Sequence, residues 1–141
     1  MKKNLLVGAT AFLALLSCGE DRDEDNTQQT TISQKITGTW TIIKKESNGM
    51  NISASLPCQN LGNFVFGSDQ KLYENYNSVV NNNCITETDS YTYSVDENSK
   101  KITTKNQQND VLVYTISSLS DKELILLNME GSDTTKYTFS K

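Results

Sequence analysis

The chain of 141 residues contains no histidine, one proline and, in Arg22, a single arginine. Histidine is the side chain most used for proton transfer near neutral pH and for binding transition metals. Its absence therefore excludes histidine-based catalytic sites and most transition-metal centres. The 13 basic residues are outnumbered by 17 acidic ones, and the net charge is −4 with a pI near 4.8. Nucleic-acid binding needs a basic surface that releases counterions from phosphate, so the charge excludes a nucleic-acid partner.

Long apolar runs are also missing, apart from one segment of 12 residues, Leu5–Leu16, which follows Lys2 and Lys3. As a helix this segment would measure about 18 Å at 1.5 Å per residue. It is too short to span a bilayer core of roughly 30 Å. A basic start followed by an apolar run of this length is typical of an export signal, which is removed from the mature protein.

The end of the apolar segment, Leu15-Leu16-Ser17-Cys18, resembles a bacterial lipobox. The resemblance implies that residues 1–17 are a cleaved lipoprotein signal peptide. It further implies that Cys18 carries diacylglycerol on its sulfur and an acyl chain on the new N-terminus. Several acyl chains, each CH₂ contributing roughly 0.8 kcal/mol, anchor a protein stably in a membrane. The alternatives are an ordinary secretory signal with an incidental Cys18, or a buried helix of the fold.

Residues 18–35 form a polar, acidic stretch that contains one large apolar side chain, Ile32. Such a stretch cannot repay its ordering entropy by burial, so we expect a flexible tether. The acidic cluster just after Cys18 resembles the signal that exports lipoproteins to the outer leaflet in some Gram-negative groups. We therefore expect an outer-membrane protein displayed at the cell surface. The alternatives are a periplasm-facing position and a tether whose charges only keep it extended.

Residues 36–141 are enough for one modest core and show the pattern of strands. Thr, Tyr, Val and Ile alternate with polar residues, and Asn, Gly, Asp and Ser cluster between the alternating segments. In the first segment Trp40 and Ile42 share one face, and Thr39, Thr41 and Ile43 share the other. Eight strands are predicted, at Gly38–Glu46, Gly62–Gly67, Lys71–Ser78, Ser90–Val95, Lys100–Lys105, Val111–Ser117, Glu123–Met129 and Lys136–Phe139.

The segment Glu123–Met129 is ambiguous, because Ser120 and Glu123 have capping-box spacing ahead of four apolar residues. A helix is the alternative here. The short run and the closing Gly131 favour a strand. Short connections then favour a meander of antiparallel neighbours, and eight such strands tend to close because closure removes unpaired edges. The predicted fold is all-β, an eight-stranded antiparallel up-and-down barrel, in preference to a sandwich.

The chain has three cysteines, and an anchor at Cys18 leaves Cys58 and Cys84 as a pair. In an oxidising compartment we expect these two to form a disulfide. Closing the loop between them would stabilise the domain by about 3 to 4 kcal/mol on the chain-entropy estimate. The alternative is a pair of free thiols that bind a metal. It lacks both a Cys-x-x-Cys motif and a histidine to complete the site.

The sequence carries no catalytic signature. No serine has a histidine partner, and no glycine-rich phosphate loop or Walker-type motif occurs. We therefore expect no catalytic residue, no cofactor and no metal. Carboxylate chemistry stays conceivable at Glu46, Glu74 and Glu87, although each is more often a solvated charge on a strand. If alternation holds, Glu74 shares a face with Leu72 and Tyr76, where its carboxylate could contact a ligand in a barrel mouth.

The order of these motifs resembles a known group. Gly38-Thr39-Trp40 opens the first of eight strands, Cys58 lies in a Leu-Pro-Cys loop, and Tyr-Thr-Phe stands in the last strand. Over residues 36–141 the chain resembles the lipocalin-like domains of bacterial lipoproteins. The resemblance implies that Gly38 and Trp40 form the barrel floor and that a basic side chain from near the final strand packs on Trp40. Because Arg22 lies in the tether, Lys136 or Lys141 would have to take that place.

The resemblance also implies binding of a small hydrophobic or amphipathic ligand without catalysis, by a protein that we expect to be monomeric. The candidate ligand-binding residues are Phe64, Phe66, Leu72, Glu74, Tyr76, Tyr91 and Tyr93. The tyrosines offer an apolar body and a polar tip, although ordinary packing also explains them. The alternative is a barrel without a cavity that acts as a structural or protein-interaction module of the cell envelope. A filled interior, with Phe64, Phe66, Leu72 and Tyr91 in mutual contact, would favour that alternative.

Overall fold

The computed structural model describes residues 30–56 and 58–141. The expected signal peptide, Cys18 and most of the expected tether lie outside the described residues. Within the described ranges, no helix is long and apolar enough to cross a membrane.

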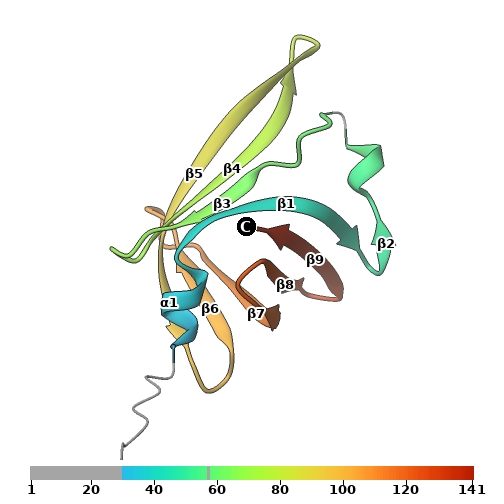
Figure 1. Ribbon diagram of the computed structural model, residues 1–141. Coiled ribbons are helices and arrows are strands. Elements are labelled where there is room, and N and C mark those ends of the chain that lie inside the picture. The colour runs from blue at the N-terminus through green and yellow to red at the C-terminus, as the bar shows by residue number, and fades with distance from the viewer. Residues whose placement is uncertain (1–29, 57) are drawn as a thin grey trace, which may run out of the picture.

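The described chain forms one antiparallel sheet that closes into a barrel (Figure 1). Strands β3 to β8 each pair with the next strand in sequence, and β1 pairs with both β3 and β9. The predicted eight-stranded up-and-down barrel is thereby confirmed, with a two-residue β2 added against the end of β1. The strands are β1 (Gly38–Ser47), β2 (Met50–Asn51), β3 (Asn63–Phe66), β4 (Lys71–Val80), β5 (Asn83–Asp96), β6 (Lys101–Lys105), β7 (Val111–Leu119), β8 (Glu123–Glu130) and β9 (Asp133–Ser140).

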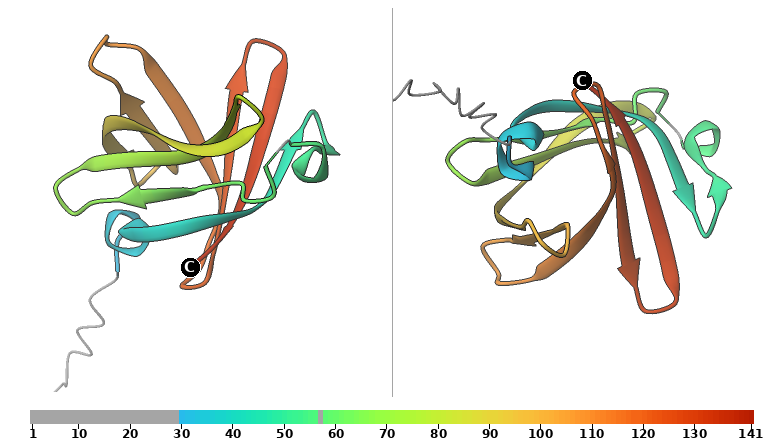
Figure 2. Two further views of the ribbon diagram at one scale, coloured as in Figure 1. Left: turned by 90° about the horizontal axis from the view of Figure 1, so that it is seen from above. Right: turned by 60° about the horizontal axis from the view of Figure 1, so that its bottom comes forward.

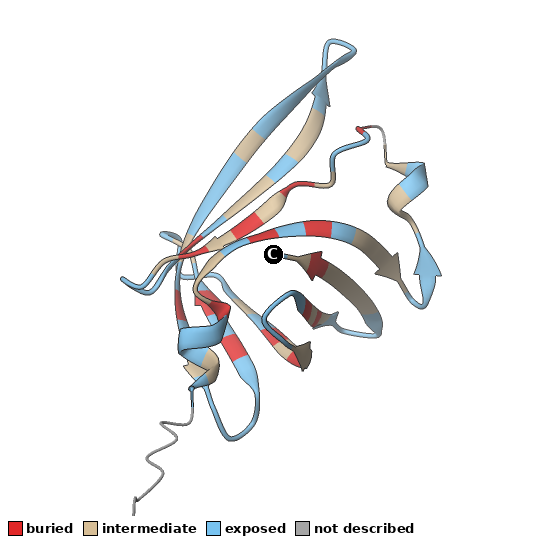
Figure 3. Cartoon of the chain, viewed as in Figure 1, coloured by how far each residue is buried: buried red, intermediate tan, exposed pale blue. Residues whose placement is uncertain are grey.

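Burial alternates along the strands, as Figure 3 shows by the spacing of the buried residues. In β6, for example, Ile102 and Thr104 are buried whereas their neighbours are exposed. Alternate side chains of a strand point to opposite faces, so one set fills the barrel and the other meets solvent. The buried apolar set forms a single cluster: Ile36, Trp40, Ile42, Phe64, Phe66, Leu72, Tyr93, Ile102, Tyr114, Ile116, Leu124, Leu126 and Phe139.

The ambiguous segment near residue 123 is strand β8, as predicted. Leu124 and Leu126 are fully buried and lie on the inner face, and β8 pairs with both β7 and β9. The Ser120 hydroxyl does accept a hydrogen bond from the Glu123 amide (3.0 Å). That contact only shapes the turn, because the alternating leucines gain more burial in a sheet than a short helix would give them.

A short helix, α1 (Ile32–Ile36), lies at the start of β1, where Figure 2 shows it beside the barrel. This helix includes Ile32–Lys35, which the polar composition assigns to the flexible tether. Thr31 and Gln34 cap the helix reciprocally, and Ile36 is fully buried in the core. Glu97, in the β5–β6 turn, accepts from the amides of Ile32 and Ser33 at 2.8 and 3.0 Å. Burial of one isoleucine together with these caps orders a segment that looks unstructured by composition.

Strands β4 and β5 form a long hairpin that projects beyond the rest of the barrel (Figure 1). Its turn, Asn81 and Asn82, has φ values of 50° and 63°. Two consecutive positive φ angles are typical of the tight type I′ turn, which suits asparagine. Strand β5 therefore begins at Asn83, seven residues before the predicted Ser90. Among the described strands, β4 is the one that pairs with β5 from Asn83 to Tyr91, because the pairing with β6 begins at Thr92.

Candidate functional site

The barrel end beside α1 is closed around Trp40, which is fully buried. Its indole Nε1 donates to the Ile36 carbonyl at 2.6 Å, and the Lys141 ammonium lies 4.8 Å from the ring centre. Lys141 also donates to the carbonyls of Lys35 (3.3 Å) and Thr37 (2.8 Å). Of the two lysines considered for this position, the structure selects Lys141. Gly38 provides the space for the Lys141 side chain, since a Cβ at this position would lie 3.1 Å from Cε of Lys141.

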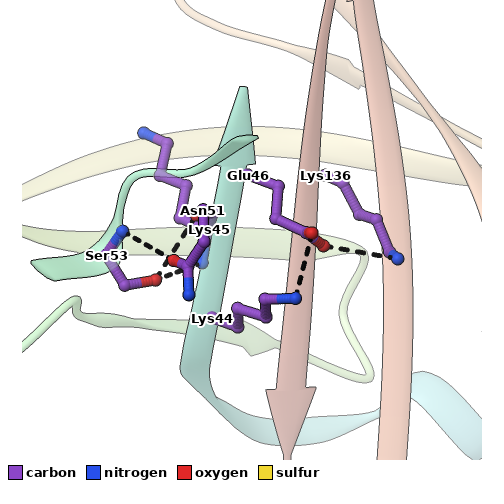
Figure 4. A network of polar contacts seen from close by, with 6 residues as sticks. All are labelled: Lys44, Lys45, Glu46, Asn51, Ser53 and Lys136. Carbon is purple, nitrogen blue, oxygen red and sulfur yellow. Dashed lines mark hydrogen bonds and ion pairs between the residues drawn. The ribbon is translucent and has the colours of Figure 1, made fainter. Parts of the chain in front are cut away.

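Lys136 instead belongs to a charged network on the outer part of β1 and β9 (Figure 4). Glu46 contacts Lys44 at 2.9 Å and Lys136 at 3.3 Å. The hydrogen bond from Lys44, together with Lys136, holds the pKa of Glu46 below its ordinary value. Nearby, the Ser53 hydroxyl accepts from the Lys45 amide at 2.8 Å and so fixes the loop after β2 against β1. Glu46, one of the three carboxylates considered for catalysis, is thus paired within the sheet.

Aromatic rings fill the middle of the barrel. Phe64 lies 5.0 Å from Phe139, 5.9 Å from Tyr114 and 6.3 Å from Phe66 between ring centres. Phe66 meets Tyr93 edge to face at 5.2 Å. These are the separations at which aromatic pairs stabilise a core. The interior between the floor and the level of Phe64 is therefore packed.

Beyond Phe64 the barrel holds a cavity of about 280 Å³. Its lining residues on β1 and β4 come after Trp40 and Leu72 along those strands, so it lies on the side away from α1. Its volume lies just below the roughly 300 to 1,000 Å³ that ligand pockets occupy. The lining combines apolar and polar side chains: Ile42, Lys45, Leu56, Cys58, Asn60, Leu61, Phe64, Glu74, Tyr76, Asn77 and Tyr137.

The loop between β2 and β3 forms one wall of this cavity and is fastened to β4 and β5. Cys58 is bonded to Cys84 of β5, which confirms the predicted disulfide. The Asn77 side chain donates to the Asn60 carbonyl at 2.7 Å. Gly62 adopts φ 95°, and a Cβ there would lie 1.9 Å from the Asn75 carbonyl oxygen. Only glycine allows the loop to approach β4 this closely.

Glu74 supplies the carboxylate of the cavity. The Tyr114 hydroxyl donates to its Oε1 at 2.8 Å. The pKa of Glu74 is raised to about 7, mainly by burial and further by the negative charge of Asp89. The hydrogen bond from Tyr114 and the positive charge of Lys45 act in the opposite direction. Burial and the negative charge of Glu74 in turn raise the pKa of Tyr114. Glu74 therefore changes charge near neutral pH, where most carboxylates are already ionised.

Lys45 is the cationic group of the lining. Its ammonium lies 5.2 Å from the centre of the Tyr137 ring. Simple alternation from Trp40 and Ile42 would place Lys44 inside and Lys45 outside. A bulge between Ile42 and Lys44 inserts one residue into β1 and reverses that assignment, so that Lys45 pairs with Tyr137.

The structure separates the candidate ligand-binding residues into three groups. Phe64, Glu74 and Tyr76 line the cavity. Phe66, Leu72 and Tyr93 belong to the packed core, where the Tyr93 hydroxyl donates to the Gly67 carbonyl at 2.9 Å. Tyr91 packs against the core and borders surface grooves beside Asn106 and Gln107. Eight lining residues were not among the sequence-predicted ligand-binding residues: Ile42, Lys45, Leu56, Cys58, Asn60, Leu61, Asn77 and Tyr137.

No arrangement typical of metal catalysis occurs in residues 30–56 and 58–141, where no three His, Cys, Asp or Glu side chains group to hold an ion. The alternative metal role of Cys58 and Cys84 is wrong, because the two sulfurs are bonded to each other. Glu87 stands opposite Tyr76 on the projecting hairpin.

The chain is similar to known proteins in both sequence and fold. The sequence profile of the lipocalin-like domain matches residues 36–126. The bovine lipocalin allergen Bos d 2 superposes with a TM-score of 0.53 at 15% identity, covering 78% of this chain and 75% of that one. Bovine odorant-binding protein in complex with a selenium-containing odorant gives 0.49 at 16% identity, with 77% and 71% covered. A dog lipocalin allergen gives 0.48 at 16%, with 75% and 73% covered. No curated protein matches the sequence.

Proposed function

The chain belongs to the lipocalin-like domain family, and from this premise we propose that its barrel binds a small hydrophobic or amphipathic molecule without catalysis. The cavity of about 280 Å³ carries the proposal. Its apolar wall of Ile42, Leu61 and Phe64 would hold a short hydrocarbon part, and Glu74 and Lys45 would meet polar groups. Ligand sites commonly combine an apolar wall with placed polar groups, and this cavity contains both.

A titration with 1-octanol, a short amphipathic probe, tests this function. The protein is the full chain carrying Cys18→Ser, which removes the proposed acylation site, and heat is measured by calorimetry. We expect saturable binding that Phe64→Trp weakens about tenfold, because the larger ring fills the cavity. Leu119→Trp, a substitution of a partly buried residue outside the lining, serves as the matched control. Equal binding by both variants would place the probe elsewhere.

We further propose that the domain is tethered to the outer membrane through acylated Cys18 and displayed at the cell surface. The sequence Leu15-Leu16-Ser17-Cys18 and the acidic residues that follow it support this location. In cells fed a labelled fatty acid, the wild-type chain is expected to take up label and Cys18→Ser to take up none. Unchanged labelling of Cys18→Ser would refute the anchor.

Orientation is tested separately, by adding protease to intact cells. Loss of the domain before lysis supports surface display. Survival of the domain in intact cells, with loss after the outer membrane is opened, supports the periplasm-facing alternative instead. A periplasmic control protein must survive in the intact cells for either result to count.

The alternative function, a barrel without a cavity that serves as an envelope interaction module, draws support from two observations. The middle of the barrel is packed by Phe64, Phe66 and their neighbours. Within the described residues, β5 also extends past β6, with which it pairs only from Thr92 onward, so that from Ile85 to Tyr91 its second edge meets no described strand. The cavity above Phe64 favours ligand binding over this alternative.

A further inference from the structure

The carboxyl group of Glu74 is only partly satisfied within the barrel. Oε1 accepts a hydrogen bond from the hydroxyl of Tyr114, a residue that is 3% exposed. Among the hydrogen bonds and ion pairs of the described residues, none reaches Oε2. An ionised carboxylate accepts on both oxygens, and Oε2 is not among the buried side-chain atoms of the described chain that lack a partner, so it is open to the solvent of the cavity. Because Glu74 lines the cavity, an occupant of the cavity can supply the missing donor.

The charges around Glu74 favour a positive donor. Asp89 stands directly opposite Glu74 across the β4–β5 pairing, and Glu87 stands opposite Tyr76 one step further along. Lys45 faces the cavity from β1, but its ammonium lies over the Tyr137 ring and makes no ion pair among those found in the described chain. The hydroxyl-bearing rings that also face Glu74 are Tyr91, Tyr114 and Tyr137.

Between Lys71 and Lys100 the sequence contains no basic residue. Apart from Lys71 at its start, the β4–β5 hairpin that forms one wall of the cavity therefore carries only carboxylates as charged side chains. A ligand carboxylate placed at Glu74 would meet like charge from Asp89, which destabilises, whereas an ammonium would meet opposite charge. A neutral alcohol would supply a hydrogen-bond donor but would lack the charge attraction to Glu74 and Asp89.

Building on the proposed function, we propose that the cavity selects a small amphipathic amine, with its ammonium at Oε2 of Glu74 and its apolar part against Ile42, Leu61 and Phe64. An ammonium group has three donors, so it can serve Oε2 and still contact the Tyr76 hydroxyl or a neighbouring ring face. The volume of about 280 Å³ limits the ligand to a short chain or a single ring.

Three probes of equal chain length test the inference: octylamine, 1-octanol and octanoate. Each is titrated into the full chain carrying Cys18→Ser at pH 8. We expect octylamine to bind about tenfold more tightly than 1-octanol, since a charged hydrogen bond contributes more than a neutral one. Octanoate is expected to bind no better than 1-octanol.

Two variants assign the preference to Glu74. In Glu74→Gln, octylamine is expected to fall to the affinity of 1-octanol, whereas 1-octanol keeps its affinity within about threefold and so reports an intact cavity. Glu123→Gln removes an exposed carboxylate outside the lining, and should change octylamine binding less than threefold.

The affinity for octylamine should also depend on pH. An ammonium pairs with ionised Glu74, so binding must first remove the proton that Glu74 holds at low pH. Because the pKa of Glu74 is about 7, octylamine affinity should rise about tenfold per pH unit between pH 5 and 6 and level off above pH 8. The affinity for 1-octanol should stay within threefold over the same range.

The outcomes distinguish the preference for an amine from the proposed ligand-binding function on which it rests. If 1-octanol binds and octylamine binds no better, or if Glu74→Gln keeps the preference for octylamine, the amine inference is wrong and the ligand-binding function stands. Tighter binding of octanoate than of octylamine would likewise show that the amine inference is wrong while the ligand-binding function stands. If none of the three probes binds, the proposed function fails and the inference fails with it.

Discussion

The ammonium of Lys141 lies 4.8 Å from the centre of the Trp40 ring and donates to two carbonyls, those of Lys35 and Thr37. This one side chain joins the end of β9 to α1 and to the start of β1. The indole in turn donates to Ile36, so ring, helix and lysine close the barrel end as a unit.

Removing this side chain should loosen the closed end. Lys141→Ala loses a cation–π contact, which contributes about 0.5 to 2 kcal/mol, and two hydrogen bonds to carbonyls. We expect the free energy of unfolding in urea to fall by about 1 to 3 kcal/mol. Lys141→Arg should retain most of it, because a guanidinium also stacks on an indole. Lys122→Ala, at an exposed lysine, is the control and should lie within about 0.5 kcal/mol of wild type. Equal loss in both alanine variants would contradict the assignment.

The Cys58–Cys84 bond should stabilise the barrel and hold the loop that forms one cavity wall. Replacing both residues by alanine is expected to lower the free energy of unfolding by about 3 to 4 kcal/mol, the cost of closing this loop from a freer unfolded chain. Urea unfolding with and without dithiothreitol measures it. The reductant should destabilise the wild type and leave the double variant unchanged. A wild type that ignores the reductant, although mass spectrometry shows its thiols to be free, would disprove the contribution.

Much of this fold could be predicted from local patterns. Trp40 and Ile42 alternate with Thr39 and Thr41, and such alternation is enough to assign a strand and its inner face. The pairing of Cys58 and Cys84 follows from counting. The sequence left two candidates, Lys136 and Lys141, for the basic side chain that packs on Trp40. Only three-dimensional geometry could identify Lys141.

The parts that the sequence did not predict have physical causes. The β-bulge after Ile42 changes which side of β1 faces inward, and nothing in the residues Ile42-Ile43-Lys44-Lys45 signals it, so Lys45 was not expected in the cavity. The first half of β5 is mostly polar and exposed because it projects beyond the core, and this removes the alternation that marks a strand. For α1 a signal existed in the capping box of Thr31 and Gln34, but the surrounding polar composition outweighed it.

The raised pKa of Glu74 predicts a stability that depends on pH. Folding raises this pKa from 4.5 to about 7, so the folded state binds more protons than the unfolded state between those values. Stability contributed by this group is therefore present below pH 4.5 and declines as the pH rises to about 7, by up to about 3 kcal/mol. Glu74→Gln removes the group that titrates, and its free energy of unfolding relative to wild type should increase from pH 5 to pH 8. Urea unfolding of both proteins at each pH gives the difference.

Tyr114→Phe provides an independent check on the same carboxyl group. It removes the hydrogen bond that lowers the pKa of Glu74, so the decline in stability should extend to higher pH than in wild type. A difference between Glu74→Gln and wild type that stays constant from pH 5 to pH 8 would show that Glu74 does not titrate in this range.

The open edge of β5 predicts an alternating pattern of amide exchange. The Tyr93 amide donates to the Gln70 carbonyl at 2.8 Å, and the pairing continues without a shift to Asn83. Antiparallel pairs alternate between bonded and non-bonded positions. The backbone groups of odd-numbered residues therefore face β4, and those of Thr86, Thr88 and Ser90 face away from it, where β6 is absent.

Hydrogen exchange measured by NMR should show this directly. Amides of Thr86, Thr88 and Ser90 are expected to exchange at least about tenfold faster than those of Ile85, Glu87 and Asp89, because only the second set is hydrogen-bonded within the sheet. Thr92 and Ser94 are the matched controls within the same strand, since their backbone groups face the same way but meet β6. These two amides should be protected. Protection of Thr86 and Thr88 equal to that of Ser94 would mean that another strand covers the edge in solution, which is the arrangement that an interaction module requires.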